Sequence, residues 1–212
     1  LLVDSLALDL SNTRNPSAMH FPNNYTNDTT ATSKLLWQGF YIKKVALTLP
    51  DTWKTGANAT QITAHNIIID DYGVTMKAKA INVITFPQGR VSDMSASLDT
   101  LEIAMLKGSL TNGYARGKLV LPISDETLTN TLKYKATFAQ VGGANSFQIV
   151  IIPSGPIDAD ILKGKITLNP TSNITATLSD NIKSMSIKLN GTFDWGDKDL
   201  SVTDATTSTG GA

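Results

Sequence analysis

The sequence contains no cysteine, and this absence removes several kinds of chemistry at once. Disulfide frameworks, thiolate zinc sites and cysteine nucleophiles all require a sulfur atom that the chain does not have. Histidine is scarce as well, with only His20 and His65 in the whole chain. A zinc site would need both of them to converge with a carboxylate, so two isolated polar positions are the simpler interpretation. We predict no metal and no organic cofactor.

Charge is also in short supply. Charged residues make up 17% of the chain, against roughly 25% in an average domain. The 18 Lys and Arg residues balance the 18 Asp and Glu residues, so the formal net charge is zero. Because no run of Lys and Arg occurs, the chain lacks the features expected of a nucleic-acid binder or of a protein held on an anionic membrane surface.

Long apolar runs are missing too, since no stretch approaches the ~20 residues that a transmembrane helix needs. The chain opens at Leu1 with neither a Met nor a signal-peptide pattern, which indicates a piece of a longer polypeptide. Many exported bacterial proteins are low in cysteine. An extracellular or cell-surface location, or membership of an exported assembly, is therefore the favoured expectation.

What the chain does have is alternation with a period of two. In residues 131–138 the even-numbered positions are apolar and the odd-numbered positions are Thr or Lys. Residues 45–49, 174–178 and 185–189 follow similar patterns. Each such segment reads as a half-buried strand with one dry and one wet face, which is typical of antiparallel sheets.

Turn signals separate these segments at intervals of roughly 8–12 residues, as in sandwiches, barrels and long meanders. Asn112-Gly113 is the strongest of them and predicts a hairpin that joins residues 101–110 to residues 114–123. The predicted fold class is all-β, either an antiparallel β-sandwich or an extended β-meander built from hairpins.

The chain divides by composition into three parts. Residues 1–34 read as an N-terminal strand and a long irregular loop, and residues 35–203 as an antiparallel β module. A division of that module into two subdomains near residues 124–145 stays open. Residues 204–212, which are Thr, Ser, Gly and Ala with one Asp, read as a flexible tail or linker.

One segment fits two structures. Ser92-Asp93 followed by Met94, Leu98, Leu101 and Met105 has the spacing of a capped amphipathic helix. Apolar residues in this segment also alternate, and its neighbours are rich in strand signals. We therefore favour a strand over residues 94–106 and keep the helix as an alternative.

A basic residue followed by Gly recurs along the chain, at 107–108, 116–117 and 163–164, each time with an aliphatic residue two positions later. Asn190-Gly191 is a looser copy. Glycine inside a strand marks a bulge or a close approach of another backbone, so this pattern predicts such positions in a few related hairpins.

Several longer motifs together suggest a family. They are Asp9–Met19, Trp37-Gln38-Gly39-Phe40-Tyr41-Ile42, Ile62–Val74 and Gly117–Pro122. The chain resembles uncharacterised, very long β-repeat proteins of bacteria over about residues 9–193. Some such proteins are encoded near phage-tail-like contractile injection systems, which implies a structural or cargo role. The resemblance implies no catalytic residues.

Acidic residues offer two further candidates. They cluster at Asp70/Asp71, Asp125/Glu126, Asp158/Asp160 and Asp194/Asp197/Asp199. A glycosidase needs two carboxyl groups facing each other at about 5–10 Å, which spacing along the sequence does not establish. The last cluster is a weak calcium candidate, because it departs from the EF-hand spacing and lacks the closing Glu. A solvated turn is the default for it.

Motifs of other enzyme classes are missing. The sequence has no Gly-x-Ser-x-Gly elbow and no Ser-x-x-Lys motif, and Gly142-Gly143 is not followed by the Gly-Lys-Ser/Thr of a phosphate loop. An enzyme is therefore not predicted.

The aromatic residues Trp37, Phe40 and Tyr41 lie close together in the sequence. If exposed on one surface they would stack on sugars, and if buried they would fill the core. Core packing is the favoured interpretation, since aromatic residues are only 7% of the chain.

The sequence thus predicts a non-enzymatic structural or interaction β module of a larger bacterial surface or assembly protein. Its partners would be other proteins or neighbouring repeats of the same chain. The alternatives are a carbohydrate-binding β-sandwich, a carboxylate-pair glycoside hydrolase and a lipid-conducting β-groove.

Overall fold

A computed structural model of the chain describes residues 1–210 except for 18, 24, 26–36, 51, 53–57, 92–93, 121–130, 142, 162–163, 180–181 and 196–198. None of the described residues lies in an α-helix. The described residues form thirteen strands: β1 (Leu2–Asp9), β2 (Gly39–Thr48), β3 (Gln61–Asp70), β4 (Gly73–Val91), β5 (Met94–Leu106), β6 (Ser109–Val120), β7 (Thr131–Val141), β8 (Ala144–Pro153), β9 (Ile157–Ile161), β10 (Gly164–Leu168), β11 (Asn173–Ser179), β12 (Lys183–Asp194) and β13 (Asp199–Gly210).

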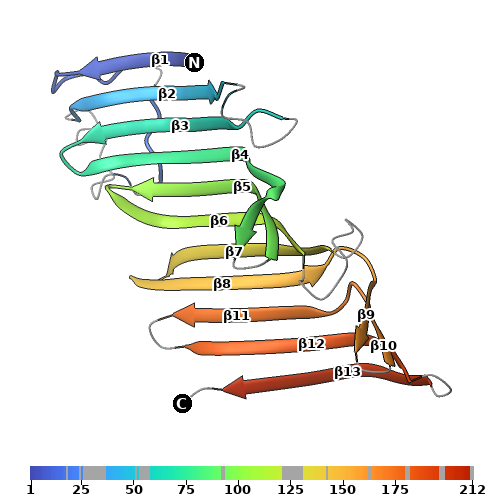
Figure 1. The fold of residues 1–212 in the computed structure, drawn as a ribbon. Coiled ribbons are helices and arrows are strands. Elements are labelled where there is room, and N and C mark those ends of the chain that lie inside the picture. Colours follow the sequence, from blue (N-terminus) through green and yellow to red (C-terminus); the bar gives the residue numbers. More distant parts are fainter. Residues whose placement is uncertain are drawn as a thin grey trace. The chain divides into compact units, whose positions relative to one another are not determined.

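The order of hydrogen-bonded neighbours is β1-β2-β3-β4-β5-β6-β7-β8-β11-β12-β10-β9, and β13 pairs with β12. From β1 to β8 each strand pairs with the next one in the chain, as a meander does (Figure 1). The strand pairs with a defined register are antiparallel. The predicted all-β antiparallel class is confirmed.

The alternation in residues 131–138 has the predicted effect in β7. Lys133 pairs with Ile152 and Lys135 with Val150, whereas Tyr134 between them pairs with Ile151. Directly opposed residues of an antiparallel pair project to the same side of the sheet. The two lysines therefore project from one face of β7 and β8, and the tyrosine projects from the other.

The segment with two possible structures is the strand β5, so the preference for a strand over a helix is confirmed. The turn that follows it was predicted at the wrong place. Asn112-Gly113 lies inside β6, and the chain reverses instead at Lys107 and Gly108, which have φ values of 51° and 76°. Positive φ at both central residues is what a type I′ hairpin turn requires.

Contacts with β4 explain why the turn forms at this place. The backbone N–H of Lys107 donates to Thr75 Oγ1 at 2.8 Å, and that of Gly108 donates to the Val74 carbonyl at 2.9 Å. Gly73 lies so close that a Cβ there would be 3.1 Å from the Gly108 Cα. The acceptors of these two hydrogen bonds lie more than thirty positions earlier in the chain, so a turn prediction based on neighbouring residues does not detect them.

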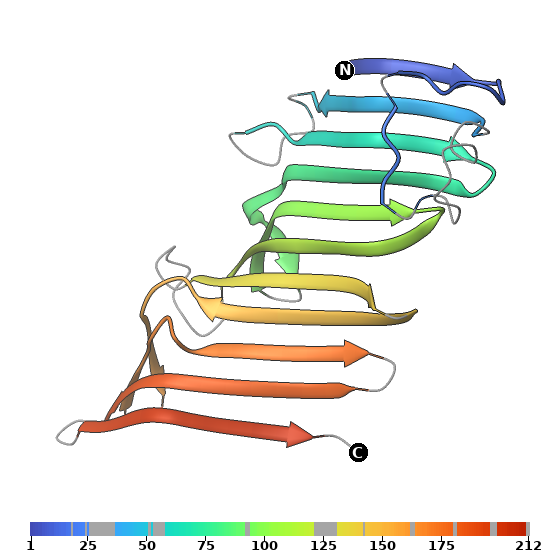
Figure 2. The same cartoon turned by 180° about the vertical axis from the view of Figure 1, so that it is seen from behind.

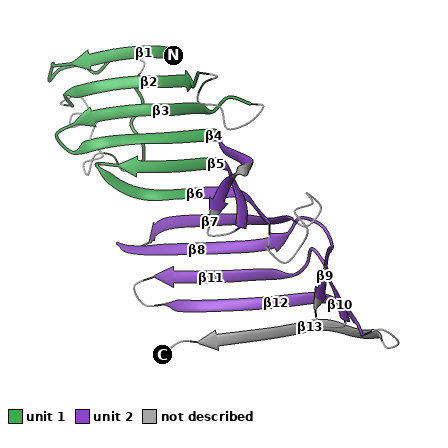
Figure 3. Ribbon diagram, in the orientation of Figure 1, with its two compact units in different colours: residues 1–82, 101–113 green, residues 83–100, 114–212 purple. Residues whose placement is uncertain are grey.

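The chain forms two compact units (Figure 3). Unit 1 comprises Leu1–Asn82 and Leu101–Gly113, and unit 2 comprises Val83–Thr100 and Tyr114–Ala212. The units thus divide within β4, β5 and β6, and not near residues 124–145.

The C-terminal residues also differ from the sequence prediction. Residues 204–210 belong to β13, whose backbone pairs with β12 from Asp199 to Gly210. Thr and Ser make up much of this segment, and Thr is a good strand former when a partner edge is available.

The core of unit 1 is formed where an irregular segment covers the sheet. We call this the covering segment, residues 10–38, of which 10–17, 19–23, 25 and 37–38 are described. Seen from behind, it crosses β2 and β3 (Figure 2). It supplies three of the five residues of the buried cluster, and Phe21 and Leu106 pack against that cluster. Its members are Met19, Tyr25, Trp37, Tyr41 and Ile68.

Unit 2 has its own, smaller core. Leu132 of β7 packs with Ala96, Leu119 and Ile157, and the half-buried Leu168 lies against them. Ile157 and Leu168 come from the β9–β10 hairpin, which therefore covers one end of the apolar side of β7 and β8.

Glycines mark close backbone approaches in unit 2, as the repeated Gly pattern predicts. A Cβ at Gly117 would lie 2.0 Å from the Ser97 carbonyl oxygen, and one at Gly191 would lie 2.0 Å from that of Thr167. At Gly164 the neighbour is the ring of Phe193, at 2.8 Å. No larger residue fits at these positions without a shift of the facing backbone or ring.

Candidate functional site

The three aromatic residues considered for sugar stacking do not form one surface. Trp37 is 6% exposed and Tyr41 is 1% exposed, and both lie in the buried cluster of unit 1. Phe40 is adjacent to Tyr41 on β2, so its side chain projects from the opposite face of the sheet. Trp37 and Tyr41 fill the core, as the favoured interpretation has it.

Asp70, at the end of β3, is the centre of a polar network beneath the covering segment. Its Oδ2 accepts hydrogen bonds from the Tyr25 hydroxyl and from Trp37 Nε1, the latter at 2.7 Å. Its Oδ1 accepts one from the Tyr72 backbone N–H at 2.9 Å. Burial, and then the hydrogen bond to Asp70, raise the pKa of Tyr25. Three donors thus hold this carboxylate, and it fixes the covering segment to the sheet.

Lys107 adds a cation to the same network. Its Nζ lies 5.6 Å from the centroid of the Tyr25 ring and 4.8 Å from that of Tyr72. A cation over an aromatic face is attracted by the ring quadrupole, at roughly 0.5–2 kcal/mol. The arrangement stabilises the cover, and Asp70 acts in it as a hydrogen-bond acceptor.

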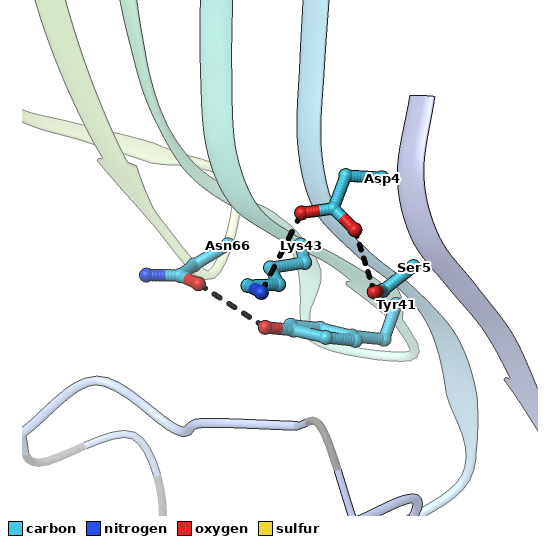
Figure 4. A network of polar contacts seen from close by, with 5 residues as sticks. All are labelled: Asp4, Ser5, Tyr41, Lys43 and Asn66. Carbon is cyan, nitrogen blue, oxygen red and sulfur yellow. Dashed lines mark hydrogen bonds and ion pairs between the residues drawn. The ribbon is translucent and has the colours of Figure 1, made fainter. Parts of the chain in front are cut away.

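A second polar group lies where β1, β2 and β3 run side by side (Figure 4). The Tyr41 hydroxyl donates to Asn66 Oδ1 at 3.1 Å, and Lys43 forms an ion pair with Asp4 at 3.5 Å. Ser5 also donates to Asp4 at 2.8 Å, and this bond, followed by the charge of Lys43, lowers the pKa of Asp4. The ion pair is exposed, so it contributes little to stability.

The other predicted acidic candidates fall in different places. Asp158 accepts a hydrogen bond from Thr167 Oγ1 at 2.6 Å and pairs with Lys165 at 2.9 Å. These two partners lower the pKa of Asp158, whereas the general acid of a glycosidase needs a raised pKa. Asp160, on the same strand, is exposed.

For the calcium candidate, only Asp194 is described with its side chain, and it is exposed. Asp125, Glu126, Asp197 and the side chain of Asp199 lie outside the described residues. His20 and His65 are both exposed. Within the described part of the chain, no group of three or more His, Asp or Glu side chains could hold a metal ion.

Strand β1 presents a surface that the sequence did not single out. Among the described strands, its single neighbour is β2. Leu2, Leu6 and Leu8 pair with Ala46, Ile42 and Phe40, and they are 58%, 57% and 62% exposed. Val3 is 45% exposed on the other side. The sequence pattern that could have revealed this surface is the alternation in Leu6-Ala7-Leu8-Asp9-Leu10. Alternation predicts a strand, but it does not show whether another element covers the apolar side of that strand.

Unit 2 carries a second exposed apolar surface, which we call the open face. Phe147 of β8 pairs with Phe138 of β7 and with Leu178 of β11, so the three side chains project to the same side. Met185 of β12 joins them through its pairing with Ala176. Phe147, Leu178 and Met185 are 37%, 51% and 43% exposed. The open face extends over four strands, and Thr, Ser, Gln and Lys predominate on the opposite side of these strands.

Comparisons with protein-family models, with curated proteins and with solved structures find no match for this chain. A search of the described residues for a helix long and apolar enough to cross a membrane finds none.

Proposed function

We propose that this chain is a non-enzymatic interaction module that joins a larger β assembly through strand β1. The observation that carries the proposal is the exposure of Leu2, Leu6 and Leu8 on a strand with one described neighbour. An edge strand offers unpaired backbone N–H and C=O groups to another strand. Recognition by strand addition uses these groups for affinity and the alternate side chains for specificity.

The composition of β1 supports this role, because it lacks the usual protection of an edge. Natural edge strands are blunted by Lys, Pro or a bulge. β1 contains no Lys and no Pro, and Asp4 is its one charged residue before the terminal Asp9. Its register with β2 keeps the same offset on both sides of Ser5, whose positive φ of 52° is the one irregularity of the strand. Each of these leucines is more than half exposed, so a partner that buried it would contribute roughly 1–2 kcal/mol.

The resemblance to long bacterial β-repeat proteins gives this edge a natural partner. In a repeat array each unit buries surface against its neighbours, and an open strand at the start of one unit is where such a neighbour would pair. The proposed role is therefore structural, as part of a larger bacterial surface protein or injection-system assembly.

The experiment is sedimentation velocity on the wild-type chain and on the double variant Leu6→Lys/Leu8→Lys at increasing concentration. We expect the wild type to self-associate through β1 and the double variant to stay monomeric, since inward charges block strand addition. The control is Leu110→Lys/Ile182→Lys, which adds the same charge at two other exposed apolar positions. A monomeric wild type, or equal loss of association in the control, would contradict the proposal.

The open face of unit 2 favours a second candidate function, the binding of lipid by a β-groove. A contiguous exposed apolar surface of this kind marks a site for protein or lipid. Mass spectrometry of an organic extract of the purified chain tests this candidate. Lipid that co-purifies with the wild type and is lost in Leu178→Lys/Met185→Lys would support it, and a lipid-free wild type would contradict it.

A further inference from the structure

Unit 2 contains a groove of about 470 Å³ on the side of its sheet opposite to the open face. It is lined by residues of β5, β6, β7 and β8. We call it the basic groove because four of its lining residues are cationic, namely Arg116 and Lys118 of β6 and Lys133 and Lys135 of β7. Asp99 is the single carboxylate among the residues that line it.

The four cations form a compact array. Residues two apart on a strand lie about 6.5–7 Å apart on the same face, and neighbouring strands are about 4.8 Å apart. β6 and β7 are neighbours, so their two pairs of basic side chains line the same short stretch of sheet. Like charges at this spacing repel one another, and a bound anion with several negative charges relieves that repulsion.

Hydrogen bonds to β5 fix the strands that carry these cations. Arg116 Nε donates to Thr100 Oγ1 at 3.2 Å, which orients the guanidinium. The Tyr134 hydroxyl donates to the Ser97 carbonyl at 2.8 Å, and the Lys118 backbone N–H donates to Ser97 Oγ at 2.9 Å. A groove whose walls are already ordered loses less entropy on binding.

The remaining lining residues indicate what kind of anion fits. Thr137 and Gln148 add a hydroxyl and an amide, which suit sugar hydroxyl groups. Val150 and Ile152 add an apolar surface for the C–H faces of a sugar ring. A carboxylate or sulfate would take the guanidinium and ammonium groups in charge-assisted hydrogen bonds.

Nucleic acid fits this groove less well. Single-stranded nucleic acid binds by stacking its bases on aromatic rings. The Tyr134 side chain is on the other face of β7, and the Tyr114 ring has the ammonium of Lys135 over it at 5.6 Å. We propose that the basic groove of unit 2 binds an acidic polysaccharide, through Arg116, Lys118, Lys133 and Lys135. This site is separate from β1 and does not depend on the proposed assembly role.

The test is titration calorimetry of the full chain with four probes of similar length. These are an oligogalacturonate, a sulfated oligosaccharide, a neutral gluco-oligosaccharide and a single-stranded DNA. We expect one or both acidic oligosaccharides to bind and the neutral one not to bind. Lys133→Gln/Lys135→Gln should weaken that binding at least roughly tenfold, because it removes two charge-assisted contacts.

The matched control is Lys77→Gln/Lys79→Gln, which removes two exposed lysines at the same spacing on a strand of unit 1. It should bind as the wild type does, and circular dichroism should show that both variants are folded. Failure of both acidic oligosaccharides to bind would overturn the proposal. An equal loss of affinity in the two double variants would also overturn it, since the oligosaccharide would then be attracted by positive charge anywhere on the chain and not by the basic groove. Tighter binding of the DNA would assign the groove to nucleic acid instead.

Discussion

Unit 1 and unit 2 are both built from strands with an apolar side, and they differ in what covers that side. In unit 1 a segment of the chain itself lies over Tyr41 and Ile68, and Asp70 fixes it there through Tyr25 and Trp37. In unit 2 the β9–β10 hairpin covers one end of the apolar side, and the open face keeps large side chains exposed among the described residues.

The difference shows two arrangements for the apolar side of a sheet: a segment of the same chain covers it, or much of it stays exposed. A cover from the same chain needs aromatic residues to fill the gap and a polar contact to hold the covering segment. Without such a cover, apolar residues that stay exposed contribute little to folding and are free for a partner. Stability should therefore depend strongly on the contacts of the cover in unit 1 and weakly on the residues of the open face.

The largest effect should come from the floor of the covered cluster. Ile68 is 0% exposed, and Ile68→Ala should reduce the free energy of unfolding by about 3–4 kcal/mol, because it leaves a cavity under the covering segment. Ile69→Ala is the control, since the neighbouring side chain projects to the other face and is 43% exposed. Urea unfolding measures both, and an equal loss would show that the cover does not seal the cluster.

The second-largest loss of stability should come from removing the hydrogen bonds between Asp70 and the covering segment. Asp70→Ala removes the acceptor of the Tyr25 and Trp37 bonds and should cost about 2–3 kcal/mol, since buried donors lose their partner. Asp71→Ala changes the adjacent, exposed carboxylate and should cost little. Limited proteolysis should cut the covering segment faster in Asp70→Ala alone. Unchanged cleavage in that variant would contradict the role of Asp70.

A smaller effect is expected on the open face. Leu178→Ser should change the free energy of unfolding by less than about 1 kcal/mol, because the side chain is already 51% exposed. Leu132→Ser, in the buried cluster of the same unit, should cost several times more. If thermal or urea unfolding shows the two losses to be equal, a cover over the open face exists and the comparison of the units fails.

The smallest effect is pH-dependent and concerns Asp158 and Lys165. Thr167 and Lys165 lower the pKa of Asp158 below its usual 3.8, so its stabilising contribution is present above that value and is lost as the pH falls through the lowered pKa. Asp158 raises the pKa of Lys165 above 10.5, so that contribution is lost as the pH rises through the raised value. The urea midpoint of Asp158→Asn should fall slightly below that of the wild type at neutral pH and match it in strong acid. A difference that persists in strong acid would contradict the pairing.

Local patterns in the sequence predicted much of the fold. Alternation in 131–138, 174–178 and 185–189 gave the strands and the two faces of β7, β11 and β12. The polarity pattern also indicated a strand at 94–106. These features depend on neighbouring residues along one strand, and a sequence displays them directly.

What the sequence did not predict depends on residues far apart in the chain. The turn at Lys107 needs Thr75, and the cover needs Tyr25 and Trp37 to meet Asp70. The basic groove arises because β6 and β7 pair after a connection of ten residues outside the described part. A net charge of zero hid this local cluster of cations, since Asp99 is the single carboxylate among the described residues that line the groove.

The central claim is that β1 adds to another strand. Residue-resolved hydrogen exchange across Leu2–Asp9, at low and at high protein concentration, tests it most directly. Strand addition predicts that the amides of β1 that are not bonded to β2 gain protection as concentration rises, while those of the central strand β3 do not change. If the outward amides of β1 exchange at the same rate at both concentrations, β1 is not the pairing edge.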